Sequence, residues 1–284
     1  MPHPEPSNLL TRRTVLKALA GAGIGAATGT VAHGFLYERH HIEVTRATLD
    51  FQGLPAALEG LKVGFLSDLH RSQTVPHALI DAAVQALLRE QPDLVVLGGD
   101  YVTWADRRYV EPAAEALAPL TAPNGVFAVL GNHDDDRHMP AALAARGFTV
   151  LRDQRTQLIV RGEKLDLVGL RYWTRRLGDV EEIVRGASSN VMLLAHTPSR
   201  LYEASELGMQ VMLSGHTHGG QIVLPGIGPV AARRFPIVSG TGRRKSTVAF
   251  VTRGVGTVYL PVRVNCLPEA ALLTLRRAGV IVER

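Results

Sequence analysis

The chain has 284 residues, 46% of them hydrophobic and 20% charged, so it can bury a full core and is not disordered by composition. The formal charge of +5 is mildly basic, but no basic stretch is interleaved with aromatic residues, so we expect no nucleic-acid partner. Because Cys266 is the single cysteine, no intramolecular disulfide can form, and any metal site must rely mainly on oxygen and nitrogen ligands. We expect Cys266 itself to be buried.

The first forty residues predict an export segment rather than part of the fold. Thr11-Arg12-Arg13-Thr14-Val15-Leu16-Lys17 resembles a twin-arginine export signal, and a weakly apolar stretch with five glycines follows to about Tyr37. Glycine costs about 1 kcal/mol relative to alanine in a helix, which favours a signal segment or a marginal membrane anchor. An ordinary amphipathic helix is disfavoured because the stretch has no charged face. We therefore predict two parts, residues 1–40 as signal or anchor and residues 41–284 as the folded domain; whether the signal is cleaved stays open.

From residue 41 to residue 214 the pattern alternates between strands and helices. Strands are predicted at 41–52 (an edge strand), 60–66, 94–97, 125–130, 148–151, 157–161, 165–169, 191–195 and 211–214. Helices are predicted at 76–90, 110–120, 139–146, 180–185 and 199–206. After residue 220 the pattern becomes all-β, with strands at 221–225, 246–254, 257–265 and 271–277 and a Gly/Arg-rich loop after the first. Without an internal repeat or a linker, this order predicts one α/β domain.

Polar side chains follow five of the predicted strands at the point where each strand ends. The residues are Asp68 and His70, Asp100, Asn132 with His133 and Asp134, His196, and His216 with His218. Ligands gather at the carboxyl ends of strands in open α/β sheets, and these residue types suit Mn, Fe, Zn or Mg. On an extended segment, the Asp-x-His and His-x-His spacings would aim both side chains the same way. A single Asp or His at a strand end is often only a turn or cap residue. This interpretation is weak for the whole set, because it would have to hold for all nine residues in order.

This ordered series, from residue 61 to residue 224, resembles the calcineurin-like metallophosphoesterase superfamily. The tail at 256–275, together with the export signal, is similar to the membrane-associated bacterial phosphodiesterase branch of that superfamily. The resemblance implies a four-layer α/β/β/α sandwich of two mixed β-sheets flanked by helices. It also implies two divalent metal ions, with Mn, Fe or Zn left open.

The resemblance assigns a role to each of the nine residues. Asp68, His70 and His218 would hold the first metal. Asn132, His196 and His216 would hold the second, and Asp100 would bridge the two. His133 would give a proton to the leaving-group oxygen and would be oriented by Asp134. Water would attack phosphorus in line, so no covalent enzyme intermediate is expected.

The function implied is hydrolysis of a phosphoester, most simply a phosphodiester, at the cell envelope. The expected partners are a phosphoester substrate, lipid-linked in one version, the twin-arginine translocase and the cytoplasmic membrane surface. The expected location is periplasmic or extracytoplasmic. One alternative is a pyrophosphatase of a nucleotide-linked lipid such as UDP-2,3-diacylglucosamine, which would need an apolar channel beside the metals. Another is a non-catalytic, metal-bound envelope module, which would lack diesterase activity.

Other residues near these motifs have competing interpretations. Arg71 could touch a phosphate oxygen or be an ordinary loop residue. Trp104, Tyr172 and Trp173 could line a substrate pocket or pack at its rim. A basic region after the last ligands could meet anionic lipid or be a solvated loop; its residues are Arg233, Arg234, Arg243, Arg244 and Lys245.

Overall fold

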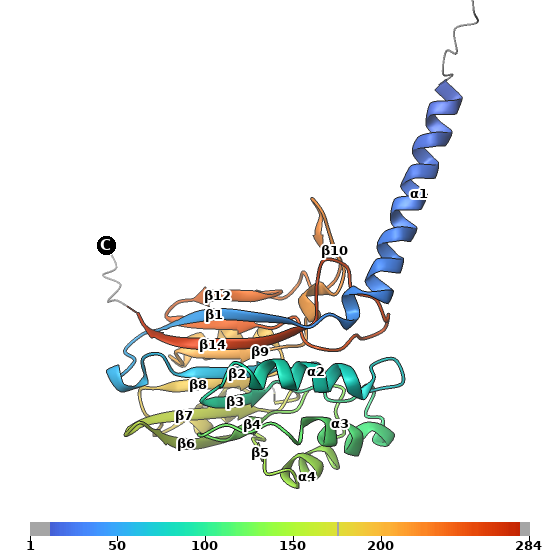
Figure 1. Ribbon diagram of the computed structural model, residues 1–284. Coiled ribbons are helices and arrows are strands. Elements are labelled where there is room, and N and C mark those ends of the chain that lie inside the picture. The colour runs from blue at the N-terminus through green and yellow to red at the C-terminus, as the bar shows by residue number, and fades with distance from the viewer. Residues whose placement is uncertain (1–11, 175, 279–284) are drawn as a thin grey trace, which may run out of the picture.

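The protein folds into two six-stranded sheets that pack face to face, with helices on both outer faces (Figure 1). The computed structural model describes residues 12–174 and 176–278. The first sheet has the order β1 (Glu43–Phe51), β14 (Glu269–Arg277), β2 (Lys62–Leu66), β3 (Leu94–Leu97), β4 (Val126–Ala128), β5 (Thr149–Val150). The second has the order β12 (Gly240–Arg244), β13 (Thr247–Val251), β9 (Val211–Ser214), β8 (Val191–Ala195), β7 (Glu163–Leu170), β6 (Gln154–Val160). The four-layer sandwich is therefore confirmed.

Both sheets are mixed, and their central strands are parallel. In the first sheet β2, β3 and β4 run parallel, while β14 pairs with β2 in the antiparallel sense. In the second sheet β7, β8, β9 and β13 are parallel, and the outer strands β6 and β12 are antiparallel to their neighbours. Parallel strands end at one edge of each sheet, so side chains that follow different strands are brought together.

Three apolar clusters correspond to the three interfaces between the layers. The central cluster lies between the sheets, where Phe65 and Phe250 meet edge to face with ring centroids 6.4 Å apart. On β3, Leu94 and Val96 join this central cluster, whereas Val95 and Leu97 face the helices, as the alternation of a strand requires. The helices on the first sheet are α2 (His77–Leu88), α3 (Val110–Leu117) and α4 (Met139–Ala144); those on the second are α5 (Leu177–Val184) and α6 (Leu201–Glu206).

Two predictions for the region after residue 220 are wrong. The Gly/Arg-rich stretch predicted as loop contains β12, which pairs with β13 across a tight turn where Lys245 has a φ of 49°. Residues 257–265, predicted as a strand, form an irregular loop with a single bridge from Val264 to Ile222. The loop takes this course because the backbone around it curls about the buried side chain of Arg263, described below.

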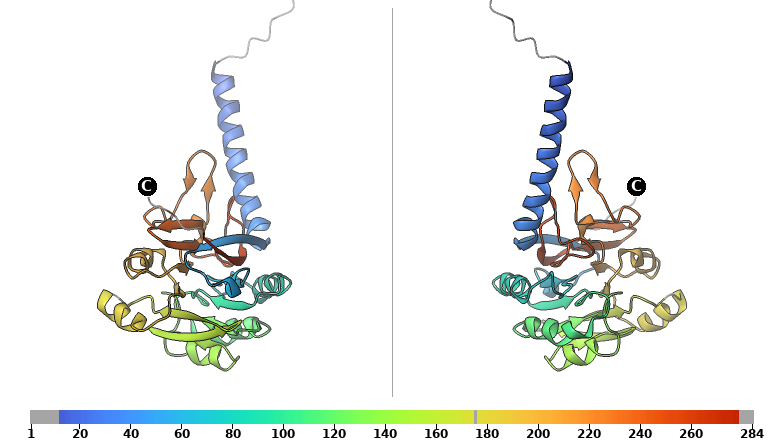
Figure 2. Two further views of the ribbon diagram at one scale, coloured as in Figure 1. Left: turned by 90° about the vertical axis from the view of Figure 1, so that its left-hand side faces the viewer. Right: turned by 90° about the vertical axis from the view of Figure 1, so that its right-hand side faces the viewer.

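The N-terminal helix and a small hairpin project from the same end of the molecule (Figure 2). Helix α1 covers Arg12–Leu36, and the hairpin consists of β10 (Val223–Leu224) and β11 (Gly228–Pro229). Within the residues that the structure describes, no helix combines the length and the hydropathy needed to cross a membrane. The predicted export motif begins at Thr11, and residues 1–11 lie outside the described part of the chain.

Candidate metal centre

Five loops that follow strands of both sheets converge on one point, and they carry all nine residues singled out from the sequence. The loops are joined through their backbones: Asp68 N donates to Gly99 O at 2.8 Å, and His70 N donates to Asp100 O at 2.9 Å. From the second sheet, Gly215 N donates to His196 O at 3.0 Å. His216 N then crosses to the first sheet and donates to the Asp68 carboxylate at 2.9 Å. The two sheets therefore build one site.

The side chains converge for a different reason from the one predicted. The Asp-x-His and His-x-His segments are not extended, so the two-residue alternation of a strand does not apply. Their ligand residues have left-handed backbones, with φ of 54° at Asp68, 49° at His70, 73° at His216 and 51° at His218. This conformation costs a non-glycine residue about 1–3 kcal/mol and is concentrated at functional sites. Tight left-handed turns at the strand ends aim these side chains into the site.

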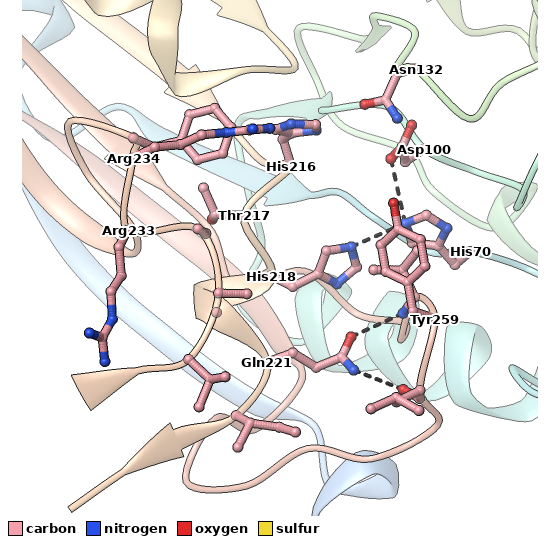
Figure 3. Close-up of a pocket in the computed structure, with 18 of the residues that line it drawn as sticks. His70, Asp100, Asn132, His216, Thr217, His218, Gln221, Arg233, Arg234 and Tyr259 are labelled. Carbon is pink, nitrogen blue, oxygen red and sulfur yellow. Dashed lines mark hydrogen bonds and ion pairs between the residues drawn. The ribbon is translucent and has the colours of Figure 1, made fainter. Parts of the chain in front are cut away.

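The possible ligands form two adjacent groups. Asp68, His70 and His218 place one ligand atom each within 4.8 Å of one another, and Asp100, His196 and His216 do the same. The Nε2 atoms of His70 and His218 lie 3.1 Å apart. Figure 3 shows both side chains at the site. Asp100 lies between the groups, since its Oδ2 is 3.5 Å from His70 Nε2 and 3.2 Å from His196 Nε2. This is the position that a bridging carboxylate would need.

Hydrogen bonds on the outer side of two imidazoles set which ring nitrogen faces the site. His196 Nδ1 lies 2.8 Å from the Gly98 carbonyl oxygen, which can only accept, so the proton is on Nδ1. His70 Nδ1 lies 3.1 Å from Thr103 Oγ1. Both rings therefore present Nε2 to the centre, in the arrangement that orients metal-binding histidines.

The electrostatics of the site favour a cation in its centre. Burial lowers the pKa of His70 to about 4 and that of His216 to about 3, so both rings are neutral and can act as ligands. Burial acts in the same direction on His196, but Asp100 and Asp68 outweigh it and raise its pKa to about 10. For Asp100, burial is outweighed by His196, and the carboxyl pKa is lowered. The protonated His196 ring thus places a positive charge beside the Asp68 and Asp100 carboxylates, where a divalent cation would compensate their negative charge.

Two glycines allow the loops to approach each other this closely. A Cβ atom at Gly131 would collide with the Asp100 carboxylate, and one at Gly215 would collide with Asp68 and Ser67. The first glycine directly precedes Asn132 and the second directly precedes His216. Any larger residue at these positions would push a carboxylate out of the site.

The donor set passes a direct test for divalent metals. Asn132 Oδ1 is buried and has no hydrogen-bond partner within the described residues, and an oxygen buried in this way requires a partner. It lies beside Asp100 and His216 at the mouth of the cavity (Figure 3). Carboxylate, imidazole and amide oxygens are the donors that Mn, Fe and Zn accept. The residues present therefore fit a dinuclear centre.

His133 lies at the edge of the site, and its support differs from the prediction. Asp134 does not orient it: the Asp134 carboxylate accepts backbone N–H groups from Gly131 at 2.8 Å, Asp100 at 2.8 Å and Tyr101 at 2.7 Å. His133 is held by Trp104, whose backbone N–H donates to Nδ1 at 3.2 Å and whose ring packs against the imidazole at 4.4 Å. Because Nδ1 accepts, the proton of the neutral ring lies on Nε2. The orienting role predicted for Asp134 is therefore wrong, and the carboxylate instead fixes the backbone around Asp100.

A cavity of about 570 Å³ is lined by candidate ligands, among them His70, Asp100 and His218. Its lining also includes the apolar side chains of Ile222, Val230, Val258 and Leu260. A second cleft shares Arg234 and Phe235 with this cavity and is lined by the predicted pocket residues Tyr172 and Trp173, with Thr197, Ser199, Arg200 and Glu203. The rings of Tyr172 and Phe235 contact His216, so this cleft adjoins the site although no candidate ligand lines it.

Arg71 does not face the site. Its guanidinium donates to the Ser72 and Val75 carbonyls and lies over the Tyr109 ring. The structure therefore favours the interpretation of Arg71 as a loop residue over a phosphate contact.

Arg263 is an important residue that sequence reasoning missed. Its side chain is fully buried, and its guanidinium donates to four backbone carbonyls, those of Arg253, Gly254, Gly256 and Cys266. The segment held in this way lies against the first ligand, since Gly256 N donates to Asp68 O at 2.7 Å. The one signal in the sequence is an isolated arginine in an apolar run, which a charge count does not single out.

Comparison with known proteins is consistent with this geometry. The profile described as calcineurin-like phosphoesterase matches residues 61–220. The chain is 31% identical to the uncharacterized metallophosphoesterase YkuE of Bacillus subtilis (strain 168) over 94% of this chain and 98% of that protein. It is 33% identical to the phosphodiesterase YaeI of Escherichia coli (strain K12), over 94% and 100% of the two chains. An uncharacterized metallophosphoesterase of Aquifex aeolicus (strain VF5) is 30% identical over 90% and 99%.

Proposed function

Because the chain belongs to the calcineurin-like phosphoesterase family, we propose that this metal-dependent phosphoester hydrolase acts on phosphodiesters. The carrying observation is that two adjoining spaces lie at the candidate metal centre: the cavity that the candidate ligands line, and the cleft of Tyr172 and Trp173, which shares Arg234 and Phe235 with it. A diester has two substituents on phosphorus, and each space can hold one of them. A monoester would use only one. The name of the relative in Escherichia coli also supports a diester.

The chain's own residues supply positioning and proton transfer. When two divalent cations are bound, they contribute Lewis-acid charge and an activated water nucleophile at neutral pH. We propose Asp68, His70 and His218 as one ligand set and Asn132, His196 and His216 as the other, with Asp100 shared between them. The remaining group, His133, lines the cavity beside these side chains, and as the imidazolium it would give a proton to the leaving oxygen and become a neutral ring. Such general acid catalysis is worth about 10²–10⁴-fold in rate.

A pyrophosphatase of a nucleotide-linked lipid is the second candidate. It is favoured by the apolar side chains that line the cavity, because such an enzyme needs an apolar channel beside the metals. The adjoining cleft offers the aromatic rings of Tyr172 and Trp173 for a base. Both candidates use the same metal centre and differ in the bond that is cleaved.

We further propose that residues 1–40 direct export by the twin-arginine translocase and that residues 41–284 act on the extracytoplasmic side of the membrane. The support is the motif that begins at Thr11 and the glycine-rich segment behind it. The same pathway exports folded proteins, so a metal can be loaded before export.

A hydrolysis screen tests the proposed function. Full-length protein with Mn²⁺ would be assayed on bis-p-nitrophenyl phosphate, p-nitrophenyl phosphate and a nucleoside diphosphate sugar. We expect diester hydrolysis at a higher kcat/KM than monoester hydrolysis. Preference for the diphosphate sugar would select the pyrophosphatase. Absence of hydrolysis of all three, with metal bound, would leave the non-catalytic binding module.

A further inference from the structure

Exposed apolar side chains are concentrated at the end of the molecule from which α1 and the hairpin project. Of the fourteen large apolar side chains exposed in the described part of the chain, nine lie on α1, on Tyr37 after it, on the β10–β11 hairpin and on the loop at 257–265. They are Leu16, Val31, Phe35, Leu36, Tyr37, Ile227, Val230, Tyr259 and Leu260. Side chains exposed in this density on one end mark an interaction site rather than ordinary surface variation.

The three segments are held together as one surface. Arg263 N donates to Gly34 O near the end of α1, and a Cβ atom at Gly34 would collide with the Arg263 carbonyl oxygen, so the helix lies directly on the loop. Val264 bridges to Ile222, where the hairpin begins. The side chain of Gln221 also holds the loop, since its Nε2 donates to Leu260 O at 2.8 Å and its Oε1 accepts from Val258 N at 3.0 Å (Figure 3).

Two basic side chains accompany the hairpin. Residues 215–240, which include the hairpin, contain no Asp or Glu and two arginines, Arg233 and Arg234. Arg233 lies at the neck of the hairpin, where its guanidinium donates to the Pro229 and Ile227 carbonyls. Exposed Ile, Val, Leu and Tyr with arginine beside them are the composition of a surface that enters the boundary of a bilayer, and the arginines favour anionic headgroups by roughly 1 kcal/mol each.

The same surface forms the entrance to the metal centre. Val230 and Leu260 line the cavity beside His218 and are also exposed, at 55% and 58%. A bilayer that contacts this surface would lie next to the apolar side chains that line the cavity.

We propose that the β10–β11 hairpin and the 257–265 loop, with the adjoining end of α1, form a docking surface for an anionic lipid bilayer, and that the substrate is an amphiphilic phosphodiester reached at that membrane. The second statement rests on the proposed function, whereas the docking itself does not. Ile227, at the hairpin tip and outside the catalytic cavity, would enter the bilayer first.

A matched pair of variants tests the docking surface. Ile227→Asp changes a tip residue that is 63% exposed, and Ile159→Asp changes a residue on β6, on the second sheet, that is 62% exposed. Full-length wild type and both variants would be sedimented with vesicles of phosphatidylcholine alone and of phosphatidylcholine mixed with phosphatidylglycerol. We expect binding to the mixed vesicles, weakened about tenfold or more by Ile227→Asp and unchanged by Ile159→Asp. Leu260→Asp tests the same surface at the 257–265 loop and should also weaken binding to the mixed vesicles.

Two results would contradict the proposed docking surface. One is unchanged vesicle binding in both Ile227→Asp and Leu260→Asp. The other is a wild-type protein that does not bind vesicles and instead self-associates through this face. Hydrolysis of the soluble diester separates this failure from failure of the proposed function. Ile227→Asp should keep full activity on soluble bis-p-nitrophenyl phosphate and lose activity on a vesicle-borne phosphodiester. Equal loss on both substrates would contradict a role in membrane docking.

Discussion

Replacing Arg263 by methionine should destabilise the protein by about 3–5 kcal/mol. The guanidinium is fully buried and serves four backbone carbonyls, of which Gly254 O also accepts the Glu269 N–H. Each buried carbonyl that loses its donor costs about 1–3 kcal/mol. Relief from burying a cation offsets part of this loss, which leaves the net figure typical of a broken buried charge network. Since whole domains are stable by only about 5–15 kcal/mol, the change should be large in an unfolding experiment.

Urea denaturation followed by circular dichroism measures this loss, and two further variants control it. Arg243→Met removes an exposed arginine from β12 and should change stability by less than about 0.5 kcal/mol. Arg263→Lys should recover little, because an ammonium with three donors cannot reproduce the planar fork. If Arg263→Met lost no more than the Arg243→Met control, the claim that this cation holds the loop against Asp68 would be wrong.

Four further changes probe the metal centre. His133→Ala should lower kcat on a diester by about 10²–10⁴-fold without changing the metal content; full retention of kcat would rule out its role as acid. Asp100→Ala should leave fewer than two metals per chain by elemental analysis, and an unchanged ratio would exclude a shared carboxylate. Gly131→Ala should weaken metal affinity by roughly 10–100-fold in calorimetric titration, because its Cβ displaces Asp100; wild-type affinity would refute the collision. Metal uptake at pH 7 should release protons, because Asp100 and Asp68 raise the pKa of His196 to about 10 despite burial and an imidazole that binds a metal must be neutral. Metal affinity should therefore fall as pH falls. Calorimetric titrations in buffers of different ionisation enthalpy that show no proton release would contradict this prediction.

The sequence predicted the elements that carry strong local patterns. Strands such as β3 and β8 are short apolar runs followed within three residues by a polar one, and that pattern can be recognised without knowing the partner strands. The same runs located the candidate ligands, because a strand end in a parallel sheet is where a ligand site forms. The structure brings all nine of these residues to one place.

The region after residue 220 was less predictable because its structure depends on contacts distant in sequence. The run at 257–265 alternates like a strand, yet its path is set by Gln221 and by the side chain of Arg263. The Arg-rich stretch around β12 has the composition of a loop and becomes a strand only by pairing with β13. Local propensity carries no information about either partner.

Within the site, residue identity was easier to predict than geometry. The two-residue spacing predicted that His216 and His218 would converge on an extended chain, but left-handed turns bring them together. The spacing does not reveal a left-handed conformation at a non-glycine residue. The support of His133 by a backbone N–H was equally hidden, since any residue at position 104 has the same amide. Backbone donors are visible only in three dimensions.

Anomalous diffraction from crystals grown with Mn²⁺ would show directly whether these residues bind two metals. We expect two anomalous peaks, one among Asp68, His70 and His218 and one among Asn132, His196 and His216, both in contact with the Asp100 carboxylate. A single peak, or peaks elsewhere with these side chains unoccupied, would contradict a dinuclear centre built from both sheets.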